Sequence, residues 1–109
     1  MAIDPNNPCI VLVTAPGEDV AKKLARSILD KKLAACVNVV PGLHSMFWWQ
    51  GKIDEQSEVL LIIKTLQDKL GALIAAVKQE HPYDTPEIIA LPIIGGSDDY
   101  LQWLRDSVD

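Results

Sequence analysis

His81 is the side chain of this sequence best suited to hold a metal ion, because imidazole is the commonest protein ligand for transition metals. Glu80 precedes it and would add a carboxylate oxygen. One imidazole and one carboxylate suit a weak site for a borderline metal such as Cu or Zn. The favoured interpretation is structural: His81 ends a predicted helix, where the partial positive charge of its ring suits the helix dipole.

The two cysteines, Cys9 and Cys36, are too few to hold a fold together, and their spacing matches neither a CxxC redox pair nor a zinc motif. We expect reduced, buried thiols. Cys36 as a soft metal ligand or a redox sensor is the less favoured alternative.

Five polar residues could line a cleft for a small charged ligand. Glu58 opens the apolar run 59–63 and Lys64 closes it, so both are expected where the sheet meets a cleft between subunits. The other members of this predicted ligand cleft are Tyr83, Asp84 and Glu87. We give equal weight to ordinary strand-end charges or an ion pair between subunits.

Enzyme motifs are absent from the sequence. It contains no G-x-S-x-G, HExxH, P-loop or dinucleotide fingerprint. A glycine pair at 95–96 precedes a predicted helix, but Asp98 and Asp99 would repel an anion there, so Ser97 is expected to be a helix cap. We therefore expect a protein without catalytic activity and keep a hydrolase or lyase with a site between subunits as a minor alternative.

The elements that must position these residues follow from hydrophobic periodicity and turn residues. The order βαββαβ plus a C-terminal helix predicts an α+β, ferredoxin-like split βαβ sandwich, with strands in the spatial order 4-1-3-2 and helices on one face.

Thr65 and Asp68 resemble a capping box that starts the second helix, with Leu66 on its apolar face. The chain is expected to be one domain, 1–109, with a flexible N-terminal lead, 1–8. The predicted strands are residues 9–15, 34–48 interrupted at 41–42, 52–64 and 86–94; the predicted helices are residues 18–32, 65–81 and 97–104.

An aromatic hairpin predicts self-association. About 15 residues at ~3.3 Å each span ~50 Å, longer than a domain of this size is wide, so the hairpin should overhang. The strands are also apolar on both faces, and the short last helix with Trp103 should cover only part of the second face. The predicted interface at the tip consists of Met46, Phe47, Trp48 and Trp49.

The composition argues against two classes of partner, nucleic acids and membranes. Fifteen acidic and ten basic residues give a formal charge of -5, so nucleic acid is not an expected partner. No apolar run approaches the ~20 residues that span a bilayer, so a membrane is not expected either. We expect a cytoplasmic protein.

Six segments together resemble the CutA family of divalent-cation tolerance proteins, over about residues 11–104. The resemblance implies a homotrimer with its sheets packed inward, similar in architecture to the PII signalling proteins, in which comparable clefts bind small charged ligands. The segments are Val13-Thr14-Ala15-Pro16, Leu33-Ala34-Ala35-Cys36-Val37-Asn38, Trp49-Gln50-Gly51-Lys52-Ile53, Lys64-Thr65, His81-Pro82-Tyr83-Asp84-Thr85-Pro86-Glu87 and Tyr100-Leu101-Gln102-Trp103-Leu104.

The metal ligands of some family members are replaced in this chain. Val13 stands where those members have a cysteine, and Glu80 stands where they have the first of two histidines. The resemblance thus implies a homotrimer that handles or senses divalent ions, with weak metal binding near the subunit boundary. The alternative is a PII-like signalling or scaffold trimer that binds a small metabolite or a partner protein.

Overall fold

The computed structural model describes residues 6–108, in which four strands and three α-helices follow the predicted order. The sheet order β2-β3-β1-β4 is the predicted order, and every strand pair is antiparallel, which confirms the α+β class. The elements are β1 (Pro8–Ala15), α1 (Glu18–Asp30), β2 (Cys36–Trp49), β3 (Lys52–Leu66), a 3₁₀ turn (Gln67–Lys69), α2 (Leu70–Glu80), β4 (Ile88–Pro92) and α3 (Asp98–Ser107).

Most of the expected flexible lead lies outside the described residues, which begin at Asn6. The carbonyl oxygens of Asn7 and Pro8 accept hydrogen bonds from the backbone N–H groups of Gln67 and Ile93. Within residues 6–108, no helix is both long and apolar enough to cross a bilayer.

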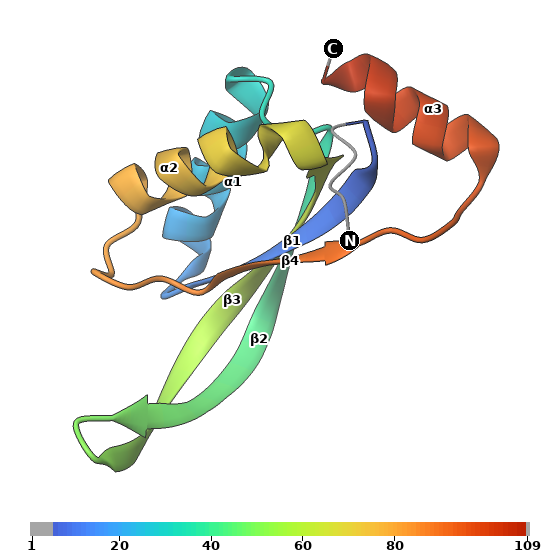
Figure 1. Cartoon of the computed structure of the whole chain (residues 1–109). Coiled ribbons are helices and arrows are strands. Elements are labelled where there is room, and N and C mark those ends of the chain that lie inside the picture. Colours follow the sequence, from blue (N-terminus) through green and yellow to red (C-terminus); the bar gives the residue numbers. More distant parts are fainter. Residues whose placement is uncertain (1–5, 109) are drawn as a thin grey trace.

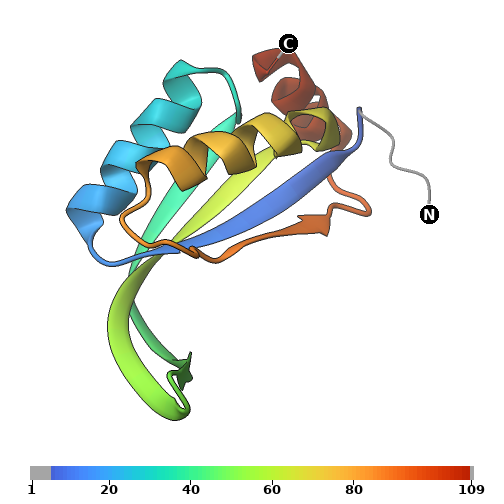
Figure 2. The same ribbon diagram turned by 60° about the vertical axis from the view of Figure 1, so that its left-hand side comes forward.

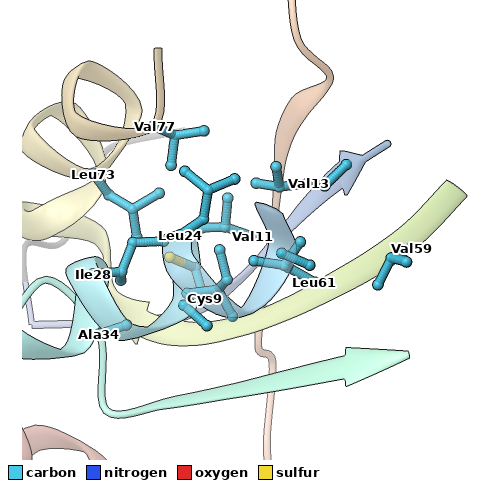
Figure 3. Close-up of a cluster of buried hydrophobic side chains, with 14 residues drawn as sticks. Cys9, Val11, Val13, Leu24, Ile28, Ala34, Val59, Leu61, Leu73 and Val77 are labelled. Atoms are coloured by element: carbon cyan, nitrogen blue, oxygen red, sulfur yellow. The ribbon is translucent and has the colours of Figure 1, made fainter. Parts of the chain in front are cut away.

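The core lies between the sheet and the two helices α1 and α2, which run side by side over one face (Figures 1 and 2). Alternate residues of β1 and β3 point into it: Val11 is opposite Ile63 and Val13 is opposite Leu61, and all four are fully buried. Figure 3 shows these strands meeting Leu24 and Ile28 of α1 and Leu73 and Val77 of α2. This contact fixes the register, because a one-residue slip would turn the buried side chains outward.

The other residues of the same strands face away from α1 and α2, and we call this side the open face. It is apolar, as predicted: Leu12 lies opposite both Ile62 and Ile89, and Ile10 lies opposite Leu91. Ile89 and Leu91 are about half exposed. Much of this apolar face therefore has no cover within one chain.

The last helix covers one end of the open face. Its buried contacts there are Leu104 and Val108 against Leu66 of β3. The last helix therefore covers part of this face, as expected, and Trp103 itself is 46% exposed.

The predicted capping box at Thr65 is also wrong. Both Thr65 and Leu66 still belong to β3, and the Thr65 hydroxyl donates to the carbonyl oxygen of Leu33 at 2.7 Å. The 3₁₀ turn then leads into α2, which has no side-chain cap. Pairing with β1, which extends to the pair Pro8 and Leu66, outweighs the local helix signal.

The overhang of the β2–β3 hairpin is confirmed. Figures 1 and 2 show it curving away from the body, and the described residues measure 43 × 31 × 24 Å. Pairing continues to Trp49 and Lys52 at the tip, with a bulge between Val40 and Leu43 that bends the ribbon without folding it back. At the turn Gln50 and Gly51 both have positive φ, 50° and 78°, which suits a two-residue hairpin.

Candidate functional site

His81 is held by backbone groups on both sides of its ring. Its Nε2 lies 2.7 Å from the carbonyl oxygen of Thr14, and its Nδ1 accepts from the backbone N–H of Tyr83 at 3.1 Å. These bonds assign a neutral ring with the proton on Nε2. His81 is also buried, so a metal there would have to displace one of these bonds.

Glu80 points elsewhere, although it is adjacent in sequence. Its carboxylate accepts from the Ser27 hydroxyl at 2.7 Å and pairs with the Lys31 ammonium at 3.5 Å, both at the end of α1. The Ser27 hydrogen bond, followed by the charge of Lys31, lowers the pKa of Glu80. An open hollow of about 430 Å³ lies beside Glu80. It is lined by two ion pairs, Glu80 with Lys31 and Asp30 with Arg26.

The two predicted metal ligands therefore do not converge within one chain. Among residues 6–108, no three His, Cys, Asp or Glu side chains gather as a set that could hold a metal ion. Cys36 lies on β2 in register with Lys64 and Ile10, whereas the His81 ring bonds to Thr14, near the other end of β1.

Two members of the predicted ligand cleft, Glu58 and Tyr83, contact each other next to the point where β3 begins to pair with β1. The Tyr83 hydroxyl donates to the carboxylate of Glu58 at 3.2 Å, and Glu58 is buried. Desolvation, and then the charge of Glu58, raise the pKa of Tyr83. Asp84 and Glu87 lie exposed in the segment that joins α2 to β4.

Lys64 is separated from this pair in the single chain. It lies on the same face of β3 as Glu58 but six residues later, which corresponds to about 20 Å along a strand. The predicted cleft is thus two clusters, one around Glu58 and Tyr83 and one around Lys64.

The Lys64 cluster joins groups from three elements. The Lys64 ammonium donates to the amide oxygen of Asn38 and lies 4.0 Å from the sulfur of Cys36, and both of these residues are on β2. Tyr100 of α3 interacts with the same thiol; burial, and then Cys36, raise the pKa of Tyr100. The arrangement places an ammonium, an amide, a thiol and a phenol at the α3 end of the open face.

Both cysteines are free, as expected. β3 lies between the strands that carry them, so they cannot form a disulfide with each other. Cys9 is buried, which raises the pKa of its thiol, whereas Cys36 is only half-buried. The expectation of a buried thiol is wrong for Cys36, because α3 leaves that part of the open face partly accessible.

The aromatic tip is apolar surface with no cover in its own chain. Trp48 is 75% exposed, Met46 64% and Trp49 59%, while Phe47 is 37% exposed. Trp48 lies opposite Ile53, itself 60% exposed, and shares its side of the ribbon with Met46. These side chains do not fold back on their own sheet.

Three contributors were missed by sequence reasoning: Asn38, Tyr100 and Thr14. Asn38 follows Cys36 by two residues, so strand alternation alone places both on one face. Their meeting with Lys64 depends on the β2–β3 register, and Tyr100 depends on the docking of α3. Thr14 acts through its backbone carbonyl, which no side-chain pattern signals.

Comparisons with known proteins cover almost the whole described chain. The family model described as "CutA1 divalent ion tolerance protein" matches residues 9–107. The divalent-cation tolerance protein CutA of Pectobacterium atrosepticum is 48% identical over 99 residues, covering 91% of this chain and 90% of that protein. The chloroplastic protein CutA 1 of Oryza sativa subsp. japonica is 54% identical over 98 residues, covering 90% of this chain. This chain spans about half the length of that relative, 55%.

Solved structures show the same fold. The crystal structure of CutA1 from Oryza sativa has a TM-score of 0.91 at 52% identity, with 93% of each chain covered. The divalent cation tolerance protein from Thermus thermophilus has a TM-score of 0.90 at 47% identity, covering 92% of this chain and 97% of the other.

Proposed function

The chain belongs to the CutA1 family of divalent ion tolerance proteins, and from this membership we propose that it acts as a homotrimer in the tolerance of, or the response to, divalent metal ions such as copper. The observation that carries the proposal is the family match over residues 9–107. The bacterial relatives that this chain covers almost completely are named for divalent-cation tolerance.

Self-association is supported by two uncovered apolar surfaces, the open face of the sheet and the hairpin tip. Aromatic side chains that are costly in water become strong anchors when they pack on a partner. A second and third copy would supply that partner and would cover apolar surface on the open face. The number of copies, three, comes from the family resemblance.

Metal binding in this proposal is weak and lies at or near the subunit boundary. Within one chain, both ring nitrogens of His81 and the carboxylate of Glu80 already have partners. Exchange of one of these bonds for a metal bond would lower the net affinity. A complete ligand set then requires groups from neighbouring copies.

Calorimetric titration of Cu(II) and Zn(II) into the metal-free protein tests this metal role. The proposal expects binding tighter than about 1 mM, roughly 4 kcal/mol, that weakens in His81→Gln, which retains an amide hydrogen-bonding group. The matched control is His44→Gln, which removes the exposed histidine of the hairpin. Absence of binding, or equal weakening in both variants, would remove the metal proposal.

We also propose that the protein has no catalytic activity and is cytoplasmic. Two free cysteines suit a reducing compartment. Cell fractionation with an antibody against the chain tests the location, and recovery from another compartment would contradict it.

A second candidate function is a PII-like signalling trimer that binds a small metabolite or a partner protein. The Lys64 cluster favours it, because a partly buried ammonium among apolar residues is a typical ligand-recognition group. A thermal-shift screen of metabolites and metals separates the two candidates. If only metals shift the melting temperature, the signalling candidate loses its support.

A further inference from the structure

Lys64 is a partly buried cation with no acidic partner among residues 6–108. No salt bridge joins it to any carboxylate of residues 6–108, although the more exposed Lys22, Arg26 and Lys31 each have one. Its recorded contacts are the amide oxygen of Asn38 and the thiol of Cys36, both uncharged groups. The positive charge of Lys64 is therefore solvated by dipoles and not neutralised.

The surroundings raise the cost of that charge. Lys64 lies between Ile10 of β1 and Cys36 of β2 on the apolar open face, next to Ile62 on the same face. A partly desolvated ammonium gains more from a counter-ion than an ammonium in water does, because the local dielectric constant is lower. The site therefore favours an anion.

The neighbours of Lys64 supply further hydrogen-bond donors. The amide oxygen of Asn38 is used by Lys64, which leaves the amide nitrogen with two N–H donors. The ammonium of Lys64 and the amide N–H groups of Asn38 together form a donor set that a carboxylate or phosphate oxygen accepts.

Apolar groups beside the cluster indicate the rest of the ligand. The rings of Tyr100 and Trp103 lie 5.4 Å apart on α3, and both are more than 40% exposed. A ligand whose anionic group meets Lys64 could place an apolar or aromatic body against this surface.

We propose that Lys64 and Asn38 form a binding site for the carboxylate or phosphate group of a small organic anion with an apolar body. The site goes beyond metal tolerance, and it names the ligand class that the second candidate function requires. Its recognition groups all come from one chain, so it does not depend on the metal proposal.

Two probes with the same ring distinguish the anionic group, benzoate for a carboxylate and phenyl phosphate for a phosphate. Each is titrated calorimetrically into the full chain at low ionic strength, with sodium chloride of matched ionic strength as the blank. At least one probe should bind with a millimolar or tighter Kd, and the tighter one identifies the group. The proposal is wrong if neither binds below about 10 mM.

Charge removal tests the assignment to Lys64. Lys64→Gln should raise the Kd at least about tenfold, because a charged hydrogen bond is lost. The matched control Lys78→Gln removes the same charge from the exposed surface of α2 and should change the Kd less than about twofold. Equal weakening in the two variants would mean attraction by overall charge and would overturn the proposal.

Asn38→Asp provides a test that does not depend on losing Lys64. The new carboxylate would lie where the amide oxygen now meets the ammonium, so the chain would carry its own counter-ion. Probe binding should fall at least about tenfold while the melting temperature stays equal or rises. Unchanged probe binding in Asn38→Asp would overturn the proposal.

The same samples separate this inference from the proposed metal role. Zn(II) titration of Lys64→Gln should match that of the unchanged protein, whatever happens to the probes. If Lys64→Gln instead dissociates the oligomer in buffer without organic anions, Lys64 pairs with a carboxylate of a neighbouring copy, and the anion site is wrong.

Discussion

The Nε2 atom of His81 lies 2.7 Å from the carbonyl oxygen of Thr14, 67 residues earlier in the chain. This bond ties the end of α2 to the end of β1, and the second ring nitrogen fixes the next segment through the N–H of Tyr83. His81, a predicted metal ligand, is therefore buried in the single chain and hydrogen-bonded to two backbone segments.

His81→Ala should lower the free energy of unfolding by about 2–3 kcal/mol. The reason is that the buried carbonyl oxygen of Thr14 and the backbone N–H of Tyr83 both lose their hydrogen-bond partner. Urea unfolding followed by circular dichroism, at a fixed subunit concentration, measures the loss. The control His44→Ala removes an exposed histidine paired with Glu55 and should cost less than about 1 kcal/mol. Equal, small losses would show that the His81 bonds contribute little.

Glu80 should give the protein a pH-dependent contribution to stability. The hydrogen bond from Ser27, followed by Lys31, lowers its pKa in the folded state below the ordinary value of 4.5. The contribution is therefore fully present above pH 4.5 and is lost as the pH falls through the lower folded value. Glu80→Gln should cost up to about 1 kcal/mol at pH 7 and less at pH 3. A cost that is the same at both pH values would contradict this linkage.

The contact of Tyr83 with the buried carboxylate of Glu58 should appear as a coupling in a double-mutant cycle. Tyr83→Phe leaves Glu58 without its recorded partner, and Glu58→Gln removes the charge that this partner stabilises. The coupling free energy should be about 1 kcal/mol or more, measured from urea unfolding of the two single variants and the double variant. Strictly additive losses would show that the bond contributes nothing to stability.

The hairpin tip should contribute to assembly and not to the fold of one chain. Trp48→Ser removes the most exposed of the large tip side chains and should weaken self-association by about 2 kcal/mol or more, as measured by sedimentation on dilution. The circular dichroism spectrum should not change. The control Leu29→Ser alters an exposed apolar residue of α1, away from the open face, and should leave association unchanged. Equal effects would show that the tip has no special role.

Much of the fold could be predicted because its strongest signals are long and local. Strands that are apolar on both faces, together with helical periodicity between the first and second strands and between the third and fourth, determine the order βαββαβ and hence the sheet order. Local signals failed where tertiary pairing competes with them. Thr65 resembled a helix cap, yet pairing with Cys9 keeps it in β3.

The candidate sites were less predictable, because they depend on register and on backbone atoms. Glu58 and Lys64 were grouped from their places at the two ends of one apolar run, but a strand separates those ends by about 20 Å. Glu80 and His81 are adjacent in sequence, yet the end of α2 directs one toward Ser27 and the other toward Thr14. Adjacency in sequence therefore did not produce a shared site.

The central claim, that this CutA1-family chain works as a homotrimer joined through its hairpin tip and open face, is tested most directly by its mass in solution. Multi-angle light scattering of the unchanged chain at micromolar concentration should give about three times 12.0 kDa. A mass of 12.0 kDa under the same conditions would contradict the claim.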